Sequence, residues 1–179
     1  MCPPDIYGRG HGLAKTHSAL IPIYVKEIQQ FGGKPFYCAD GTNTRSWVHI
    51  DDLVRLYLHV VEAAASNRDA ANYFNENGYY FAGTQDHSQL NVARATGAVL
   101  HRHDIIGTVE PVSITLETVD SMASTYIPGF PKLARYLFAS NSRTSADRAG
   151  KLFGYKGGAP GLMEVLESDV LEAVNVKSS

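Results

Sequence analysis

The sequence predicts a helix-rich α+β fold with short strands, and three observations lead to that prediction. Apolar residues make up 44% of the 179-residue chain and charged residues 19%, the profile of a folded globular protein. Two segments, 18–31 and 51–65, repeat apolar side chains at helical spacing. Segments in which apolar and polar residues alternate, and segments rich in aromatic residues, are short and are bounded by Gly, Pro or Asn. This pattern indicates brief, non-consecutive strands.

The bulk composition argues against several classes of function. The chain contains 16 Lys and Arg and 18 Asp and Glu, and no run of basic residues alternates with aromatic residues. Nucleic acid is therefore not an expected partner. Cys2 and Cys38 are too few for a disulfide framework and lack zinc-ligand spacing, which favours a reducing, cytoplasmic setting. No signal-peptide pattern occurs, and no apolar run approaches the roughly 18 residues of a membrane span, so we expect no membrane partner.

The first helix is predicted over residues 18–31, where one side of the helical pattern is apolar. Pro22 is compatible with this helix only in the first turn, where its missing N–H would be unpaired anyway. The pair Gly32-Gly33 ends the helix, and residues 35–38 are typical of a strand. A polar turn at 40–44 follows.

Residues 45–50 alternate as a short strand that leads directly into the helix predicted at 51–65. Asp51 and Asp52 stand at the start of this helix, where carboxylates can cap free N–H groups and interact favourably with the helix dipole. The apolar stripe of the helix, which we predict to be buried, consists of Leu53, Leu56, Tyr57, Val60, Val61 and Ala64.

The second half of the chain is less regular. Residues 79–81 are predicted to form an aromatic strand after an Asn-Gly turn, and a helix is predicted near 86–100. The segment 101–130 mixes polar and apolar residues, and no structure is predicted for it. Two helices are predicted at the end, at 144–153 and 161–174.

The glycine-rich stretch 6–12, IYGRGHG, has the composition of a phosphate-binding loop but not its spacing. A dinucleotide fingerprint that begins at Gly8 would need its third glycine at position 13, which is Leu13. No complete strand precedes the stretch. We therefore interpret it as a turn at the end of a strand.

Two arginines lie at element boundaries. Arg45 begins a strand and Arg143 precedes a helix, so together they would suit a diphosphate if the fold brings them together; each is otherwise plain surface charge. His49 with Asp51 and Asp52 suggests a charge pair, but we favour a strand histidine followed by capping carboxylates. No metal site is predicted.

Three segments share the order and spacing of motifs in a known family: PPDIYGRGHG at 3–12, RSWVHIDDLVRLYLHVVEAA at 45–64 and SRTSADRAGKLFGYK at 142–156. With them, the chain resembles the C-terminal half of an extended short-chain dehydrogenase/reductase, the family of nucleotide-sugar epimerases, dehydratases and related reductases. Residues 78–100 are most similar to an atypical reductase-like branch.

The resemblance implies a fold of the α/β family and a function. Residues 1–179 would form a single substrate-binding lobe that lacks most of the Rossmann sheet, because the N-terminal Rossmann portion is absent. The complete enzyme would use NAD or NADP and act on a carbinol or carbonyl carbon of a small molecule, such as a nucleotide sugar. A homo-oligomer is also consistent with the family.

The resemblance also implies roles for particular residues. Pro3 and Ile6 would border the nicotinamide ring of the cofactor. Four residues would contact the substrate. Tyr7 and Gly8 would form the floor of the site. Arg45 would contact the phosphates of the substrate, and Arg143 is a weaker match for a second phosphate contact. Cys2 stands where the family usually has arginine.

The chain departs from the family in its chemistry. It lacks the glycine-rich cofactor loop, and no tyrosine is followed four residues later by lysine, so no catalytic residue is assigned. Alone, the chain is expected to be catalytically inactive and not to bind NAD or NADP tightly. The alternative is a non-catalytic binding or regulatory module derived from the same family; a hydrolase that uses His49 has no nucleophile motif. Exposed apolar surface is expected where the absent sheet would pack.

Overall fold

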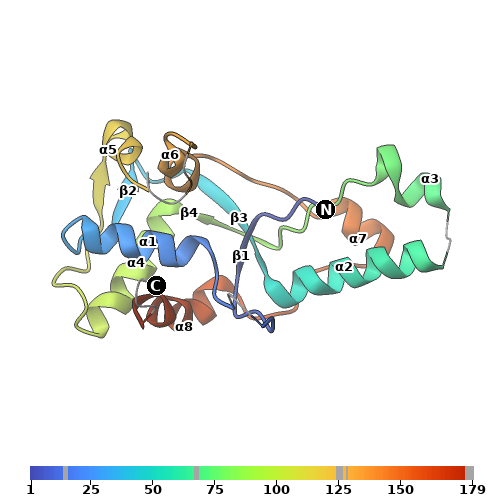
Figure 1. Cartoon of the computed structure of the whole chain (residues 1–179), viewed down its shortest axis with the longest axis horizontal. Helices are drawn as coiled ribbons and strands as arrows, with labels where there is room; N and C mark the ends of the chain where they lie inside the picture. Colours follow the sequence, from blue (N-terminus) through green and yellow to red (C-terminus); the bar gives the residue numbers. More distant parts are fainter. Residues whose placement is uncertain (14–15, 67–68, 124–126, 128, 176–179) are drawn as a thin grey trace.

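The computed structural model describes residues 1–13, 16–66, 69–123, 127 and 129–175 (Figure 1). Its central sheet contains β1 (Asp5–Tyr7), β3 (Thr44–His49) and β4 (Gln85–Ser88), in the order β1-β3-β4. β1 runs parallel to β3, and β4 runs antiparallel to it. A second sheet pairs β2 (Phe36–Cys38) with β5 (Val112–Ile114) in parallel.

Helices cover both faces of the central sheet. Successive strand residues point to opposite faces, so Tyr7 and Trp47 enter the main core and Ile6 and Val48 the smaller one. The main core is built with α1 (Leu20–Gln30), α4 (Gln89–Arg102) and α8 (Leu162–Asn175). The smaller core is built with α2 (Ile50–Ala65) and α7 (Asp147–Phe153).

The remaining elements are short. They are α3 (Ala70–Tyr73), the 3-10 helix η1 (Asn75–Asn77), α5 (Leu116–Asp120) and α6 (Leu133–Phe138). Among the described residues, no helix combines the length and apolar character that crossing a bilayer requires. The prediction of a helix-rich chain with short strands in small sheets is confirmed.

Most of the predicted elements form near their predicted bounds. The helices expected at 18–31, 51–65 and 161–174 are α1, α2 and α8, and Pro22 lies in the first turn of α1. The strands expected at 35–38 and 45–50 are β2 and β3. The helix expected at 144–153 begins only at Asp147.

The segment 79–100 differs from the prediction. The aromatic strand at 79–81 is reduced to one isolated bridge, between Phe81 and Cys2. Residues 86–88, predicted as the start of a helix, instead belong to β4, which pairs with β3. The Ser88 side chain then accepts a hydrogen bond from the Asn91 N–H and caps α4. Sheet pairing with a distant strand therefore overrides the local helical pattern.

The capping of α2 also differs from the prediction. The N-cap is His49, whose Nδ1 accepts a hydrogen bond from the Asp51 N–H at 3.2 Å. Asp52 is buried and accepts hydrogen bonds from backbone N–H groups far along the chain. The imidazole, not a carboxylate side chain, caps the helix.

Residues 101–130, for which no structure was predicted, contain β5 and α5. Residues 124–126 and 128 lie outside the described part of the chain. α6 was not predicted either, because its six residues are too few to show a helical period.

Tyr24 joins α1 to the second sheet. Its hydroxyl is buried, donates a hydrogen bond to the Phe36 carbonyl at 2.5 Å and accepts one from the Phe36 N–H at 3.1 Å. Burial raises the pKa of this phenol, so it stays protonated and able to donate. One side chain thus satisfies both backbone groups of a strand residue.

We expect Tyr24→Phe to lower the free energy of unfolding by about 1–3 kcal/mol, because the Phe36 N–H and carbonyl both lose a buried partner. Chemical denaturation followed by circular dichroism measures the change. Tyr136→Phe is the matched control, since that side chain is exposed; an equal effect in both variants would contradict the assignment.

Candidate functional site

A cavity of about 390 Å³ lies at the carboxyl end of β1, between this strand and the start of α1. In open α/β sheets, ligands bind outside the carboxyl ends of the strands. Its lining is mostly apolar, with polar side chains on the segment that leads into α1. The lining residues are Pro4, Asp5, Ile6, Gly8, Gly10, Thr16, His17, Ser18, Ala19, Leu20, Ile23, Ile50 and Leu137.

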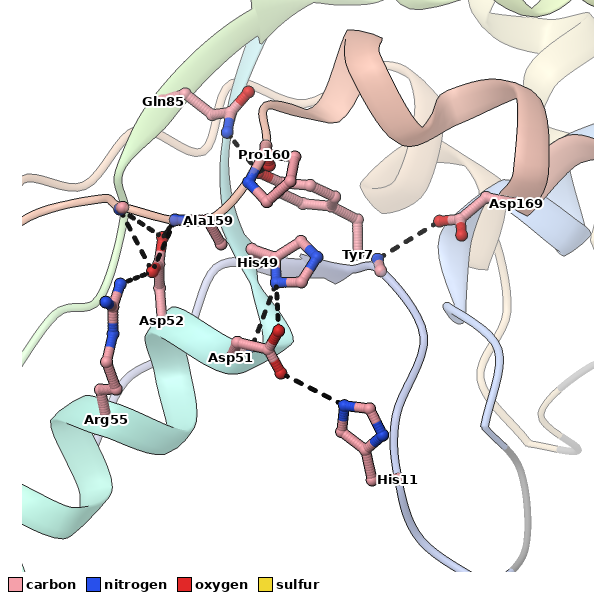
Figure 2. Close-up of polar contacts among 12 residues, drawn as sticks. Tyr7, His11, His49, Asp51, Asp52, Arg55, Gln85, Ala159, Pro160 and Asp169 are labelled. Atoms are coloured by element: carbon pink, nitrogen blue, oxygen red, sulfur yellow. Dashed lines mark hydrogen bonds and ion pairs between the residues drawn. The ribbon is translucent and has the colours of Figure 1, made fainter.

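Gly8 ends β1 and turns the chain into the cavity wall. Its φ of +83° is a conformation that favours glycine, and a Cβ at this position would lie 2.4 Å from Nε2 of His49. Its N–H donates a hydrogen bond to Oδ2 of Asp169 at 3.4 Å (Figure 2). Gly8 is therefore required by the backbone turn and by the close approach of His49.

Asp169 holds this turn from the C-terminal helix α8. The side chain is buried, and burial raises the pKa of its carboxyl group, while the Gly8 N–H opposes the rise. The shift favours the protonated form in the folded state and so weakens stability as the pH rises from the ordinary aspartate range. A buried carboxyl group thus lies directly behind the cavity wall.

Tyr7 points away from the cavity and into the main core. Its hydroxyl donates a hydrogen bond to the Pro160 carbonyl at 2.8 Å and accepts one from Nε2 of Gln85 (Figure 2). Burial, with a smaller contribution from the charge of Asp52, raises the pKa of Tyr7 to about 12. The phenol is therefore a poor source of tyrosinate near neutral pH.

His49 and Asp52 connect β3 and α2 to distant segments. The His49 side chain is buried and packs edge-on against the Tyr7 ring, 5.2 Å between centroids. Asp52 accepts hydrogen bonds from the N–H groups of Gly158 and Ala159 and pairs with Arg55 (Figure 2). These contacts support the interpretation of His49 and Asp52 as structural residues.

Arg45 lies behind the rim of the cavity. It forms two hydrogen bonds to Asp5, of 2.5 and 3.0 Å, and Asp5 lines the cavity. Its Nη1 donates to the Tyr136 carbonyl at 2.6 Å and to the Ser140 hydroxyl at 2.8 Å. Most of the guanidinium donors are thus satisfied within the chain.

The structure does not bring Arg143 and Arg45 together as a clamp. Their backbones are neighbours, since Arg45 forms a bridge with Ser142. However, Arg143 donates to Oδ2 of Asp86 at 3.0 Å, and Asp86 also contacts Ser46. Adjacent strand residues point to opposite faces, so the two guanidinium groups lie on opposite sides of the sheet.

Of the two residues predicted to border the nicotinamide ring, only one lies in the cavity wall. Ile6 lines the cavity and packs against the smaller core. Pro3 is exposed and is not part of the cavity wall, where its neighbour Pro4 takes part instead.

Sequence reasoning missed the opposite wall of the cavity. Residues 16–20 follow the end of β1, so their position after a strand was a usable signal. Leu137 comes from the unpredicted α6, and Asp169 comes from a helix more than a hundred residues away, so no local pattern reveals either.

A wider and shallower hollow of about 630 Å³ lies beside α7, on the side of the smaller core. Lys151 and Lys156 line it together with three glycines. None of the predicted site residues lines this hollow.

Comparison with known sequences identifies two relationships. Residues 1–74 match the sequence profile of the NAD dependent epimerase/dehydratase family. The chain is also 32% identical over 104 residues to a dTDP-4-dehydro-6-deoxy-D-allose reductase of Streptomyces bikiniensis, a match that covers 58% of this chain and 28% of that protein.

Comparison with solved structures shows the fold. A dTDP-glucose 4,6-dehydratase of Streptomyces venezuelae, solved with NAD, has a TM-score of 0.54 at 16% identity over 94% of this chain and 41% of its own length. A UDP-glucuronic acid 4-epimerase of Bacillus cereus, solved with UDP-glucuronic acid and NAD, has a TM-score of 0.51 at 15% identity over 98% of this chain and 44% of its own length.

The chain therefore spans less than half the length of the structures that it matches. Residues 1–74 carry the sequence pattern of the NAD dependent epimerase/dehydratase family, and the resemblance of the chain to the extended short-chain dehydrogenases/reductases is confirmed.

Proposed function

We propose that this chain is the substrate-binding part of an NAD(P)-dependent epimerase, dehydratase or reductase, and that its substrate is a nucleoside diphosphate sugar. The observation that carries the proposal is the cavity at the carboxyl end of β1, walled by Ile6 and Gly8. Its volume suits one sugar or one flat ring, and its apolar wall with a few polar groups is typical of small-molecule sites.

NAD or NADP would supply the hydride acceptor or donor in the complete enzyme. The cavity fits only one end of such a cofactor: Ile6 and Pro4 offer an apolar wall for a ring, whereas Pro3 is exposed outside that wall. The chain has no glycine-rich fingerprint for the pyrophosphate. We therefore assign this chain the exclusion of water beside the ring, and assign proton transfer to none of its residues.

The proposed phosphate contact is Arg45; Arg143 lies on the opposite side of the sheet and is not assigned to the same diphosphate. A diphosphate at the rim would bind Arg45 by displacing one of its present partners, such as the Ser140 hydroxyl. The Asp5 carboxylate would keep the guanidinium oriented toward the rim. Gly8 forms part of the floor, and Tyr7 supports it from the core through the bond of its hydroxyl to Pro160.

The alternative function is a non-catalytic binding or regulatory module of the same descent. The observation that favours it is the absence of a tyrosine followed four residues later by lysine. Both functions use the same cavity, so they differ in chemistry and not in the ligand. Two free cysteines are consistent with the proposed cytoplasmic setting.

We expect UDP-glucose or dTDP-glucose to bind in the cavity and Ala19→Trp to weaken that binding by about tenfold or more, which corresponds to about 1.4 kcal/mol. Ala19 is exposed and lines the cavity, so an indole there occupies the space of the ligand without disturbing the core. Isothermal titration calorimetry measures the affinity. Ala64→Trp, at an exposed position of α2, is the control; equal affinities in both variants, or no binding of either sugar, would contradict the proposal.

We expect Arg45→Ala to lower both the affinity for the same sugars, by about tenfold, and the free energy of unfolding, by about 1–3 kcal/mol. Stability falls because the carboxylate of Asp5 loses its partner. The double variant Asp5→Ala/Arg45→Ala separates the two roles, since it removes the unpaired carboxylate. It should regain stability but not affinity. Recovery of both would show that Arg45 acts only through the fold.

A further inference from the structure

Asp169 and Ser18 are two buried polar side chains beside the cavity that the proposed function leaves unused. Asp169, on α8, is 3% exposed, and its Oδ2 accepts a hydrogen bond from the Gly8 N–H (Figure 2). Ser18 is 7% exposed and lines the cavity. The Ser18 hydroxyl is near enough to lower the pKa of the Asp169 carboxyl, but it completes no hydrogen bond within the described part of the chain.

The Asp169 carboxyl group therefore interacts with two walls of the cavity. Gly8 belongs to the turn that ends β1, and Ser18 belongs to the segment that leads into α1. The carboxyl group comes from a third element, α8, and lies 161 residues from Gly8 along the chain. A change in this one group acts on both walls at once.

Three titratable groups interact with this carboxyl group. Glu172, on the same helix, raises the pKa of Asp169, and His49 of β3 lowers it. Tyr7 of β1 also faces it, but its own pKa of about 12 keeps the phenol neutral. Burial is the largest cause, and it raises the pKa of Asp169.

The charged groups on the two helices that pack against α8 have other positions or partners. On α1, Lys26 is exposed, and Glu27 accepts a hydrogen bond from a backbone N–H of the turn after α5. On α4, Arg102 and His103 both pair with Glu167. The carboxyl group behind the cavity therefore has no cation from either helix as an ion-pair partner within the described residues.

Ionisation of this group favours separation of the walls. A buried carboxylate is costly unless hydrogen bonds satisfy it, and the bond from the Gly8 N–H is long, at 3.4 Å. In an arrangement that admits water, the pKa of Asp169 returns toward the ordinary aspartate range. Below that range both arrangements are protonated and neither is favoured. As the pH rises from it, the open arrangement ionises first and gains population.

We propose that Asp169 is a proton-controlled tie between the two walls of the cavity. Its neutral form holds the Gly8 turn and the Ser18 segment together, and its ionised form lets them separate. The effect on ligands rests on the proposed function. A nucleoside diphosphate sugar excludes water from the walls and carries negative charge, so it binds more tightly to the neutral, closed form. Asp169 is a positioning residue, because it acts through Gly8 and Ser18.

The first test needs no ligand. NMR titration of the Asp169 carboxyl carbon between about pH 4 and pH 8 should give a midpoint above the ordinary aspartate value. Near pH 7, the Gly8 and Ser18 amides should exchange their hydrogens faster in the wild type than in Asp169→Asn, which keeps the shape of the neutral acid and does not ionise. Near pH 4 the two proteins should exchange equally.

Equal exchange near pH 7, or an ordinary midpoint for Asp169, would overturn the proposal. The NMR titration also separates the carboxyl group from the imidazole of His49, which lies against Gly8 and belongs to a residue type that ionises in the same range. A pH response of the Gly8 amide that persists in Asp169→Asn belongs to His49 and counts against the tie. Circular dichroism shows whether the variant is folded, and the wild-type midpoint is measured without any variant.

The second test follows the affinity for UDP-glucose by calorimetry at about pH 5 and pH 8. If binding raises the pKa of Asp169 by one unit, the affinity falls about tenfold across the titration. Asp169→Asn should remove this fall, and Glu117→Gln, an exposed carboxyl on α5, should keep it. An equal fall in Asp169→Asn would overturn the link to the ligand. No binding at either pH, with the first test positive, would support the tie and contradict the proposed function.

Discussion

The parallel pairing of β1 with β3 is the interaction on which the rest of the structure depends. It places Tyr7 opposite His49 and Ile6 opposite Val48, so one face of the pair enters the main core and the other the smaller core. It also fixes where β1 ends, and the cavity begins at that end with Gly8. A three-residue strand is too short to hold this position by its backbone hydrogen bonds alone.

Three carboxyl groups supply the remaining restraint. Asp5 orients Arg45, Asp52 binds the loop before α8 and Asp169 binds the turn at Gly8. Each contact joins segments at least 40 residues apart. Because a buried carboxyl group is costly without hydrogen bonds, each of them specifies one arrangement of the segments that it joins. The cavity wall is therefore set by long-range polar contacts, and its apolar lining only fills the shape that they define.

The sequence predicted the elements with a long apolar period and the residues around β1 and β3. α1, α2 and α8 were recognisable because each carries an apolar period over three or more turns, although half of the stripe predicted to be buried in α2 (Tyr57, Val61 and Ala64) is exposed. β4 was missed because its strand state depends on pairing with β3, not on its own residues. The opposite directions of Arg45 and Arg143 follow from the alternation of β3 with its neighbours, which is visible only once the register is known.

The central claim is that the cavity at the end of β1 is the ligand site of this chain. Chemical-shift mapping of the ¹⁵N-labelled protein during titration with dTDP-glucose tests it most directly, because every backbone amide reports separately. We expect the largest changes at Gly8, Gly10, Ser18 and Leu20, which line the cavity. Changes confined to the hollow beside α7, at Lys151 and Lys156, would contradict the claim and move the site to the other face of the sheet.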